Sequence, residues 1–336
     1  MNMNRRSFLK SAVVLTVAPI AGSCSLSNVR IVEGLPVSAF SMSSTAEEVT
    51  AGIDLTGKYV VVTGCNSGIG YETMRVLALR GAHVIGTGRD LAKASTACAS
   101  VAGKTTPVVL ELADLQSVVD GAAAIRDIVP HIDMLICNAG MVAGADLEQI
   151  NGIEQTFMVN HLGHFVFVNR LLDRVKAAPQ GRVVMVSSSA AFSSAGIEFD
   201  NLSGERDYAS WRAYSQSKLA NALFALELAD RLAGTGATAN ALHPGVIKTN
   251  IARNKPWYLR ALFATGSLFL KSSAQGAATT CYVATSPQLA GVSGYFFADC
   301  KPITASGKNH IYDKTMARQL WQVSEQLTAK YLAQAV

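Results

Sequence analysis

The sequence has few of the features that mark a metal, membrane or nucleic-acid-binding protein. Its six cysteines are scattered, without a CxxC pair or a His/Cys metal spacing, so we expect mostly buried thiols and no metal site. The apolar run at residues 11–20 is far shorter than the roughly 20 residues that span a bilayer. The net charge of +5 includes three basic residues and no acid from positions 1–23, leaving 5 − 3 = +2. So small a charge gives no reason to expect a nucleic-acid partner.

Residues 1–23 have the three parts of a bacterial export signal: a basic start, an apolar run and small residues at 21–23. The segment NRRSFLK, with Arg5 and Arg6, resembles the twin-arginine signal, whose pathway carries folded proteins. Cys24 follows the small residues, where bacterial lipoproteins are cleaved and acylated. We therefore expect a periplasmic or membrane-anchored protein. The alternative is a cytoplasmic protein whose first residues are disordered or whose translation starts at Met42.

The remaining chain has the pattern of an α/β protein. Residues 24–53 are rich in Ser, Thr and small residues and lack periodicity, which predicts a linker. Residues 54–336 alternate strands with helices and show no internal repeat, which predicts a single doubly wound Rossmann-type domain with a mostly parallel seven-stranded sheet. The strands are expected at 59–63, 83–86, 107–110, 134–137, 183–187, 238–242 and 294–297, and helices at 70–80, 115–128, 153–177 and 213–232.

A glycine-rich turn follows the first of these strands, in KYVVVTGCNSGIGYE. Gly64, Gly68 and Gly70 would let the backbone turn tightly and approach a pyrophosphate held at the helix N-terminus. Ser67 and Ile69 lie between them and belong to the same predicted cofactor site. A glycine-rich turn alone could be a mere strand-to-helix connection.

Further motifs follow in a fixed order, and together they resemble the short-chain dehydrogenase/reductase family. The resemblance runs from about residue 54 to 298, and the segments FDNLSGERDYASWRAYSQSKLANALFALELADRL and GAATTCYVATSPQLAGVSGYFFADC look most like its retinol dehydrogenase-like branch. The motifs are Asn138-Ala139-Gly140, Asn160 in VNHLGHF, the serines of VVMVSSSA, Tyr214 with Lys218, and His243-Pro244-Gly245 with Thr249.

Tyr214 and Lys218 are four residues apart, so a helix places both side chains on one face. A phenol has a pKa of about 10, and a nearby ammonium favours the phenolate, so the pair is predicted to transfer a proton. The resemblance implies that Tyr214 exchanges a proton with the substrate oxygen and that Lys218 also holds the nicotinamide ribose. It further implies that Ser188, or else Ser187, hydrogen-bonds that oxygen, and that Asn160 holds a water linking Lys218 to solvent.

The second strand indicates the cofactor. Gly88 stands where members of the family that prefer NAD have an acid, and the guanidinium of Arg89 suits the 2′-phosphate of NADP. Asp90 is a competing acid, but its place before LAKAS fits a helix N-cap. We expect NADP, with NAD possible. The resemblance adds to this site the residues Asp114, against the adenine, and Asn138, Gly140, Tyr214, Lys218, Pro244, Gly245 and Thr249.

The segment 250–272 is apolar and lies where the family folds a lid over the substrate. It predicts a small apolar alcohol or carbonyl substrate, although core packing, a subunit contact and a membrane-facing patch remain open. The sequence thus predicts an NAD(P)-dependent oxidoreductase, a short-chain alcohol dehydrogenase or carbonyl reductase, expected as a homo-oligomer. The alternative is a catalytically silent dinucleotide-binding regulatory or scaffold protein on the same fold.

Overall fold

The computed structural model describes residues 29–247, 270–305 and 309–332. The predicted export signal, Cys24, Thr249 and most of the predicted lid at 250–272 lie outside the described residues.

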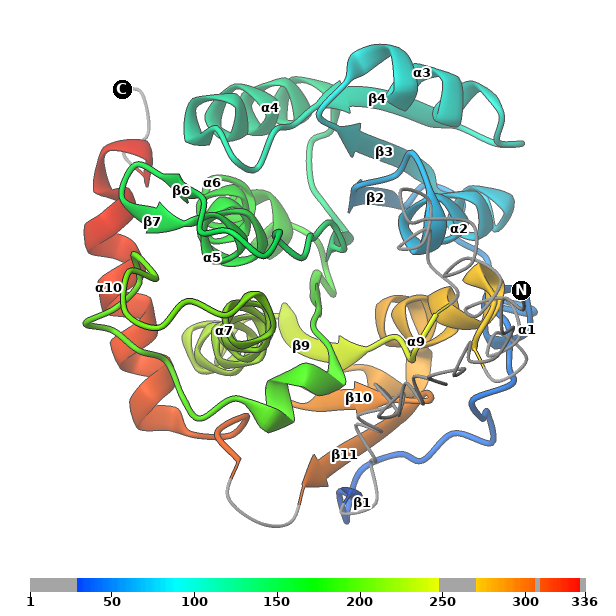
Figure 1. The fold of residues 1–336 in the computed structure, drawn as a ribbon. Helices are drawn as coiled ribbons and strands as arrows, with labels where there is room; N and C mark the ends of the chain where they lie inside the picture. Colours follow the sequence, from blue (N-terminus) through cyan, green and yellow to red (C-terminus); the bar gives the residue numbers. More distant parts are fainter. Residues whose placement is uncertain (1–28, 248–269, 306–308, 333–336) are drawn as a thin grey trace, which may run out of the picture.

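The protein is built on one nine-stranded sheet in the order β1-β11-β10-β9-β8-β5-β2-β3-β4 (Figure 1). Seven strands run parallel to their neighbours, as predicted: β2 Tyr59–Thr63, β3 His83–Gly88, β4 Thr105–Val109, β5 Met134–Cys137, β8 Arg182–Val186, β9 Thr238–His243 and β10 Phe296–Ala298.

Two strands beyond the predicted seven extend the sheet at one edge. Strand β11 (Lys301–Ala305) returns antiparallel to β10, and β1 (Val29–Ile31) pairs antiparallel with β11. The α/β class and the parallel core of the sheet are confirmed, while the strand count rises from seven to nine.

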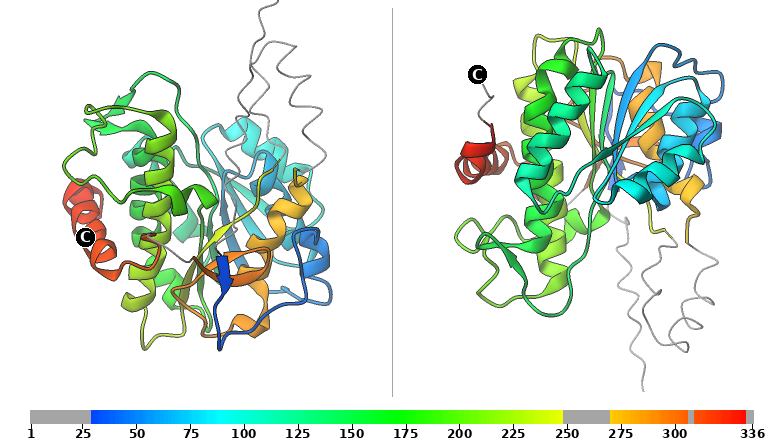
Figure 2. Two further views of the ribbon diagram at one scale, coloured as in Figure 1. Left: turned by 60° about the horizontal axis from the view of Figure 1, so that its bottom comes forward. Right: turned by 90° about the horizontal axis from the view of Figure 1, so that it is seen from above.

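Helices cover both faces of the sheet and enclose a separate hydrophobic core on each (Figures 1 and 2). One face carries α1 (Ala46–Val49), α2 (Gly68–Leu79), α3 (Leu91–Ala99) and α9 (Ser273–Thr285). The other carries α4 (Leu115–Ile128), α6 (Gly163–Lys176) and α7 (Ser210–Arg231), with α10 (Lys314–Leu332) packed outside α6 and α7. Short 3₁₀ turns lie at Ser189–Ser193 and Pro287–Leu289. None of the helices within the described residues is long and apolar enough to cross a bilayer.

The described part of the predicted linker, residues 29–53, is packed against the domain. It contributes β1 and α1, and Ala46 and Val49 are buried in the core beside α9. A capping box starts α1, in which Thr45 and Glu48 hydrogen-bond each other's backbone N–H groups. The linker prediction was therefore wrong for residues 29–53. It depended on a lack of periodicity, and elements of three and four residues are too short to show a period.

The helix predicted at 153–177 is interrupted. Strands β6 (Gln149–Ile150) and β7 (Ile153–Glu154) form a small hairpin, and α5 (Gln155–Phe157) follows, capped by the Glu154 carboxylate. A π turn at Met158–Leu162 then leads into α6, with the N–H of Gly163 donating to the carbonyl of Met158. Such turns occur frequently at functional sites. This one contains Asn160 and buries its side chain.

Candidate active site

The segments predicted to carry function meet at one edge of the sheet. The loops after β2, β5, β8 and β9 all leave the carboxyl ends of neighbouring parallel strands, which is where ligands bind in open α/β sheets. Helix α7 packs beside β8 and β9 and brings Tyr214 and Lys218 to the same edge.

The loop between β2 and α2 forms a cradle that only glycines permit. Gly64 has φ +71° and Gly68 has φ +60°, in the left-handed region that favours glycine. A Cβ on Gly70 would lie 2.2 Å from the carbonyl oxygen of Gly64. Ser67 is the N-cap of α2 but makes no side-chain capping bond, so the first N–H groups of the helix stay available to an anion. The loop therefore fits a dinucleotide pyrophosphate, with Ile69 packed behind it against the core.

The loop after β5 is fixed to the end of β2. The amide of Asn138 donates to the carbonyl of Thr63 at 2.9 Å, and the backbone N–H groups of Asn138 and Ala139 both donate to the Thr63 hydroxyl at 2.9 Å. Gly140 comes next, and a Cβ there would lie 3.2 Å from both Asn160 Oδ1 and Lys218 Nζ. The backbone of this loop thus passes directly over the buried lysine.

Lys218 is the most unusual group of the site because its side chain is almost fully buried, at 4% exposure. Its ammonium donates to the carbonyl oxygen of Val186 at 3.0 Å. Burial lowers the pKa of Lys218 to about 8, so this group can gain or lose its proton close to neutral pH. The Nζ atom lies 5.7 Å from the centre of the Tyr214 ring.

Burial raises the pKa of the Tyr214 phenol, and the nearby Ser188 side chain acts in the opposite direction with a smaller effect. The predicted lowering by Lys218 is not what the structure shows, because the ammonium lies over the ring and donates to Val186. Ser187, the alternative serine, donates its hydroxyl to the carbonyl of Lys218 at 2.6 Å, whereas the Ser188 hydroxyl accepts the N–H of Ala190 at 3.2 Å; Ser188 stays the predicted serine of the site.

The side chain of Asn160 is occupied by the protein itself. Its amide nitrogen donates to the Met141 carbonyl and the Ser217 hydroxyl, each at 2.9 Å, while its oxygen accepts from the Met141 N–H at 2.8 Å. Both amide hydrogens of Asn160 are therefore engaged within the protein, and its water-holding role stays a prediction.

The adenosine end of the predicted site has a solvent-exposed guanidinium. Arg89 follows β3 directly and is exposed, whereas Gly88 is buried. Asp90 is the N-cap of α3, as predicted, and its carboxylate accepts from the Lys93 N–H at 3.1 Å. Asp114 is likewise an N-cap, accepting from the Gln116 N–H at 2.9 Å. Its position at the end of the loop after β4 leaves its predicted contact with the adenine open.

Lys271 is a residue of this region that the sequence analysis missed. It is buried, forms a 2.6 Å ion pair with Asp299, and its side chain lies against Gly245, where a Cβ would be 2.5 Å from Lys271 Cδ. Gly245 thus packs against Lys271, whose ammonium pairs with Asp299. No motif marks Lys271, because its neighbour in space is 26 residues away along the chain.

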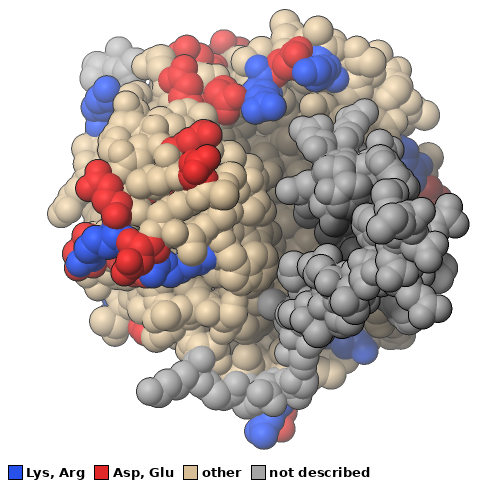
Figure 3. All heavy atoms as spheres, viewed as in Figure 1, with Lys and Arg blue, Asp and Glu red and all other residues tan. Residues whose placement is uncertain are grey.

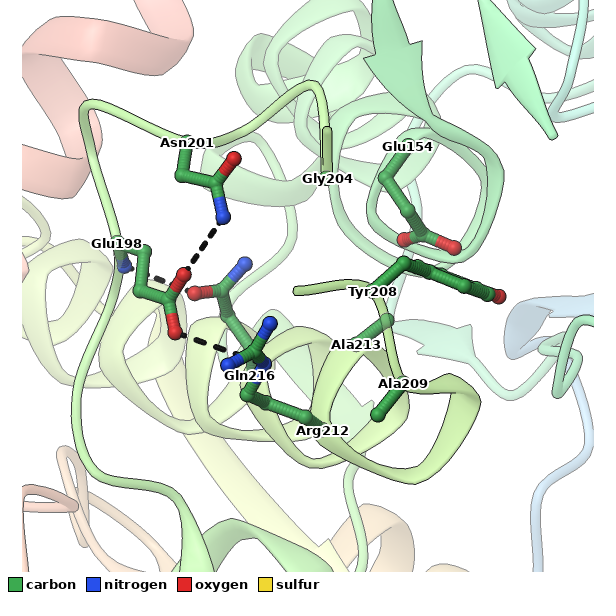
Figure 4. Close-up of a pocket in the computed structure, with 9 residues that line it drawn as sticks. All are labelled: Glu154, Glu198, Asn201, Gly204, Tyr208, Ala209, Arg212, Ala213 and Gln216. Carbon is green, nitrogen blue, oxygen red and sulfur yellow. Dashed lines mark hydrogen bonds and ion pairs between the residues drawn. The ribbon is translucent and has the colours of Figure 1, made fainter. Parts of the chain in front are cut away.

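A separate polar cavity of about 20 Å³ lies beside the start of α7 (Figure 4). Glu198 accepts from Asn201 at 2.8 Å within it, and Arg212 lies 3.7 Å from the same carboxylate. Such a volume holds about one water molecule and is too small for a substrate. This cavity is therefore a structural feature behind the site.

Taken together, the anion cradle, the glycine that passes over a buried lysine, and the Tyr214–Ser188 pair define a dinucleotide-binding oxidoreductase fold. The family model for short chain dehydrogenases matches residues 58–257, and the chain belongs to the short-chain dehydrogenase family.

Several relatives align over most of the chain. The human WW domain-containing oxidoreductase is 41% identical over 303 residues, which are 86% of this chain and 72% of that protein. Human retinol dehydrogenase 14 is 40% identical over 80% of this chain and 85% of its own. Among solved structures, an uncharacterised protein from Mycobacterium paratuberculosis has a TM-score of 0.67 and 36% identity, covering 84% of this chain and 97% of its own. The Pseudomonas aeruginosa RhlG/NADP active-site complex has a TM-score of 0.59 and 25% identity, covering 73% and 95%.

Replacing Lys218 by Met is expected to stabilise the protein while abolishing turnover. The pKa of Lys218 in the folded protein, about 8, is below its unfolded value of 10.5, so burying the charge costs up to about 3 kcal/mol below pH 8. That cost falls as the pH rises from 8 to 10.5. Urea unfolding of the cofactor-free protein should therefore show a gain of about 1–3 kcal/mol at pH 7 that shrinks at pH 10. Exposed Lys176→Met is the control, and equal effects of the two substitutions would contradict the assignment.

Proposed function

We propose that the protein is an NADP-dependent alcohol dehydrogenase or carbonyl reductase, moving a hydride between nicotinamide C4 and the carbon of an apolar alcohol or carbonyl compound. The observation that carries this proposal is the buried Lys218 beneath Gly140, with its ammonium 5.7 Å from the centre of the Tyr214 ring, at the carboxyl edge of the sheet. A silent binding protein could use Lys218 to hold the ribose, but it would not also need the Tyr214 phenol beside that lysine.

The bound nicotinamide would supply the hydride acceptor or donor. The residues of the chain would transfer the proton and hold the substrate oxygen in position. During reduction the Tyr214 phenol would give its proton to the carbonyl oxygen, which becomes the alcohol, and during oxidation the Tyr214 phenolate would take that proton back; Ser188 would hydrogen-bond the same oxygen in both directions. Lys218, with a pKa near 8, exchanges a proton close to neutral pH, and its Val186 contact fixes its direction.

The preference for NADP is supported by charge. The exposed guanidinium of Arg89 stands at the end of β3, the strand end that lies beside the adenosine ribose in this fold. Asp90, the nearest acid, is engaged in capping α3 and in an ion pair with Lys93 at 3.3 Å. A solved relative is titled as an NADP complex. All three observations favour a 2′-phosphate over a free 2′-hydroxyl.

An apolar substrate is supported by exposed apolar side chains in the segments that carry the site. Val142 follows Gly140, Trp211 precedes Tyr214 and Val246 follows Gly245, and they are 50%, 57% and 60% exposed. The Trp211 ring lies 5.6 Å from that of Tyr214. Figure 3 shows charged side chains along the upper and left margins of this face and an uncharged described centre. Long-chain, retinoid-like or steroid-like molecules would suit these exposed apolar side chains. Several relatives are named retinol dehydrogenases.

Purified protein with NADPH is expected to reduce apolar aldehydes or ketones, followed by nicotinamide absorbance. Tyr214→Phe should keep cofactor binding and folding but lose about 10²–10⁴ in turnover, because it removes the proton donor. Tyr331→Phe, which removes a phenolic hydroxyl on α10, away from the site, is the matched control. Near-normal turnover by Tyr214→Phe would remove Tyr214 from the mechanism. Tight NADPH binding without turnover of any long-chain, retinoid or steroid substrate would favour the silent binding protein instead.

Arg89→Asp is expected to weaken NADP binding far more than NAD binding, because it places a carboxylate beside the 2′-phosphate. Loss of one charged hydrogen-bonding contact typically costs about 1.5–3 kcal/mol, or roughly 10–150-fold in the dissociation constant. Fluorescence titration with NADPH and NADH measures the ratio. The control is Lys104→Asp, which changes the charge by the same amount. Lys104 precedes β4 and so lies at the opposite end of the strands. Equal losses for both cofactors would exclude Arg89 from this role.

We also propose export through the twin-arginine route, supported by Arg5 and Arg6 ahead of the apolar run. A folded-protein route would let the domain bind its cofactor before crossing the membrane. Changing both arginines to Lys should leave the precursor in the cytoplasm, and Cys24→Ala should release the protein from membranes if Cys24 is acylated. Fractionation that finds the unaltered chain soluble in the cytoplasm, with its first residues intact or with translation starting at Met42, would contradict export.

A further inference from the structure

A buried histidine connects the end of β2, next to the glycine cradle, to the π turn that contains Asn160. His164, in the first turn of α6, is fully buried. Its Nε2 atom lies 3.0 Å from the Thr63 hydroxyl, at the end of β2, and its Nδ1 atom lies 3.1 Å from the backbone carbonyl of Asn160. The imidazole therefore spans two elements that are about 100 residues apart in the sequence.

The partners of His164 fix its protonation and tautomer. A carbonyl can only accept, so Nδ1 must carry the hydrogen that points to Asn160. The Thr63 hydroxyl already accepts two N–H groups, from Asn138 and Ala139, so its own hydrogen is the one directed at Nε2. A protonated imidazole would place a second hydrogen against that occupied oxygen. Burial and the charge of Lys218 both lower the pKa of His164, to about 4, in agreement with a neutral ring.

We propose that His164 is a positioning residue that couples the dinucleotide cradle to Asn160 and through it to Lys218. On one side, Thr63 holds Asn138 and Ala139 and precedes Gly64 of the cradle. On the other side, the imidazole N–H occupies one of the two lone pairs of the Asn160 carbonyl oxygen. Any further hydrogen bond to this oxygen must therefore come from the side of the second lone pair. Asn160 in turn borders Lys218 at Gly140. This inference rests on the proposed function and concerns the same site.

The neighbouring titratable groups do not take over this role. His161, one turn earlier, is buried and hydrogen-bonds Ser324 on α10 through Nε2 at 2.8 Å. Lys218, from α7, donates to Val186. Neither makes a hydrogen bond to Thr63 within the part of the chain that the structure describes, so His164 is the ring that joins the two halves of the site.

Two amide substitutions separate the halves of the bridge. An Asn amide nitrogen reaches the position of imidazole Nδ1, whereas a Gln amide reaches that of Nε2. His164→Asn should therefore keep the Asn160 contact, with turnover near that of the parent and weaker NADPH binding. His164→Gln should keep the Thr63 contact, with near-parental NADPH binding and turnover lower by on the order of 10–100-fold, since small misplacements of reacting groups have such effects. His164→Phe should lose both.

A direct test needs no turnover. Ring ¹⁵N NMR of the full chain should show His164 as the neutral Nδ1–H tautomer from pH 5 to 9, and binding of NADPH is measured by fluorescence. An Nε2–H tautomer, or titration of His164 in this range, would overturn the inference. So would equal losses of NADPH binding and turnover in the Asn and Gln variants, which a purely structural role predicts. If no substrate is turned over, the proposed function fails while the tautomer and the NADPH-binding difference still decide the role of His164.

Discussion

The buried ammonium of Lys218 is the group on which the arrangement of the site depends. Burial makes the charged form costly, and the described residues offer it a carbonyl rather than a carboxylate. Its surroundings accommodate that constraint: Gly140 lacks a side chain where a Cβ would lie 3.2 Å from the ammonium, and Ser187 donates a hydrogen bond to the lysine's own carbonyl. Within the described residues the ammonium has no carboxylate partner. Such a group is suited to a ligand that brings negative charge and hydroxyl groups.

The two halves of the molecule divide the work of the site. The core on the side of α2, α3 and α9 supports the glycine cradle, and the core on the side of α4, α6 and α7 supports Asn160 and the Tyr–Lys pair. They meet along the strand ends, where polar contacts replace apolar packing. Thr63 is central there, because one hydroxyl receives two backbone N–H groups and faces His164. The precision of the site therefore rests on a few buried hydrogen bonds.

Much of this architecture could be predicted from the sequence, and the remainder escaped for physical reasons. Strands such as Tyr59–Thr63 and Met134–Cys137 are continuous apolar runs, which parallel sheets require on both faces. Strand β1 and helix α1 are too short to show a period, and the π turn at Asn160 has no sequence signature of its own. The spacing of Tyr214 and Lys218 correctly places them on one helix but says nothing of where the ammonium points. Contacts such as Lys271 with Gly245 join distant segments and can be seen only in three dimensions.

The position of α10 has a consequence for quaternary structure. Trp321 stacks on Phe224 of α7 with ring centres 5.4 Å apart, meets Phe165 of α6 edge to face at 5.0 Å, and is covered by Arg231 at 4.0 Å. Helix α10 thus covers the outer side of the α6–α7 pair. A second copy could reach that apolar surface only by displacing α10. A symmetric assembly that used this side of the molecule would therefore contact α10, and the part of α7 around Phe224 would not reach the subunit boundary.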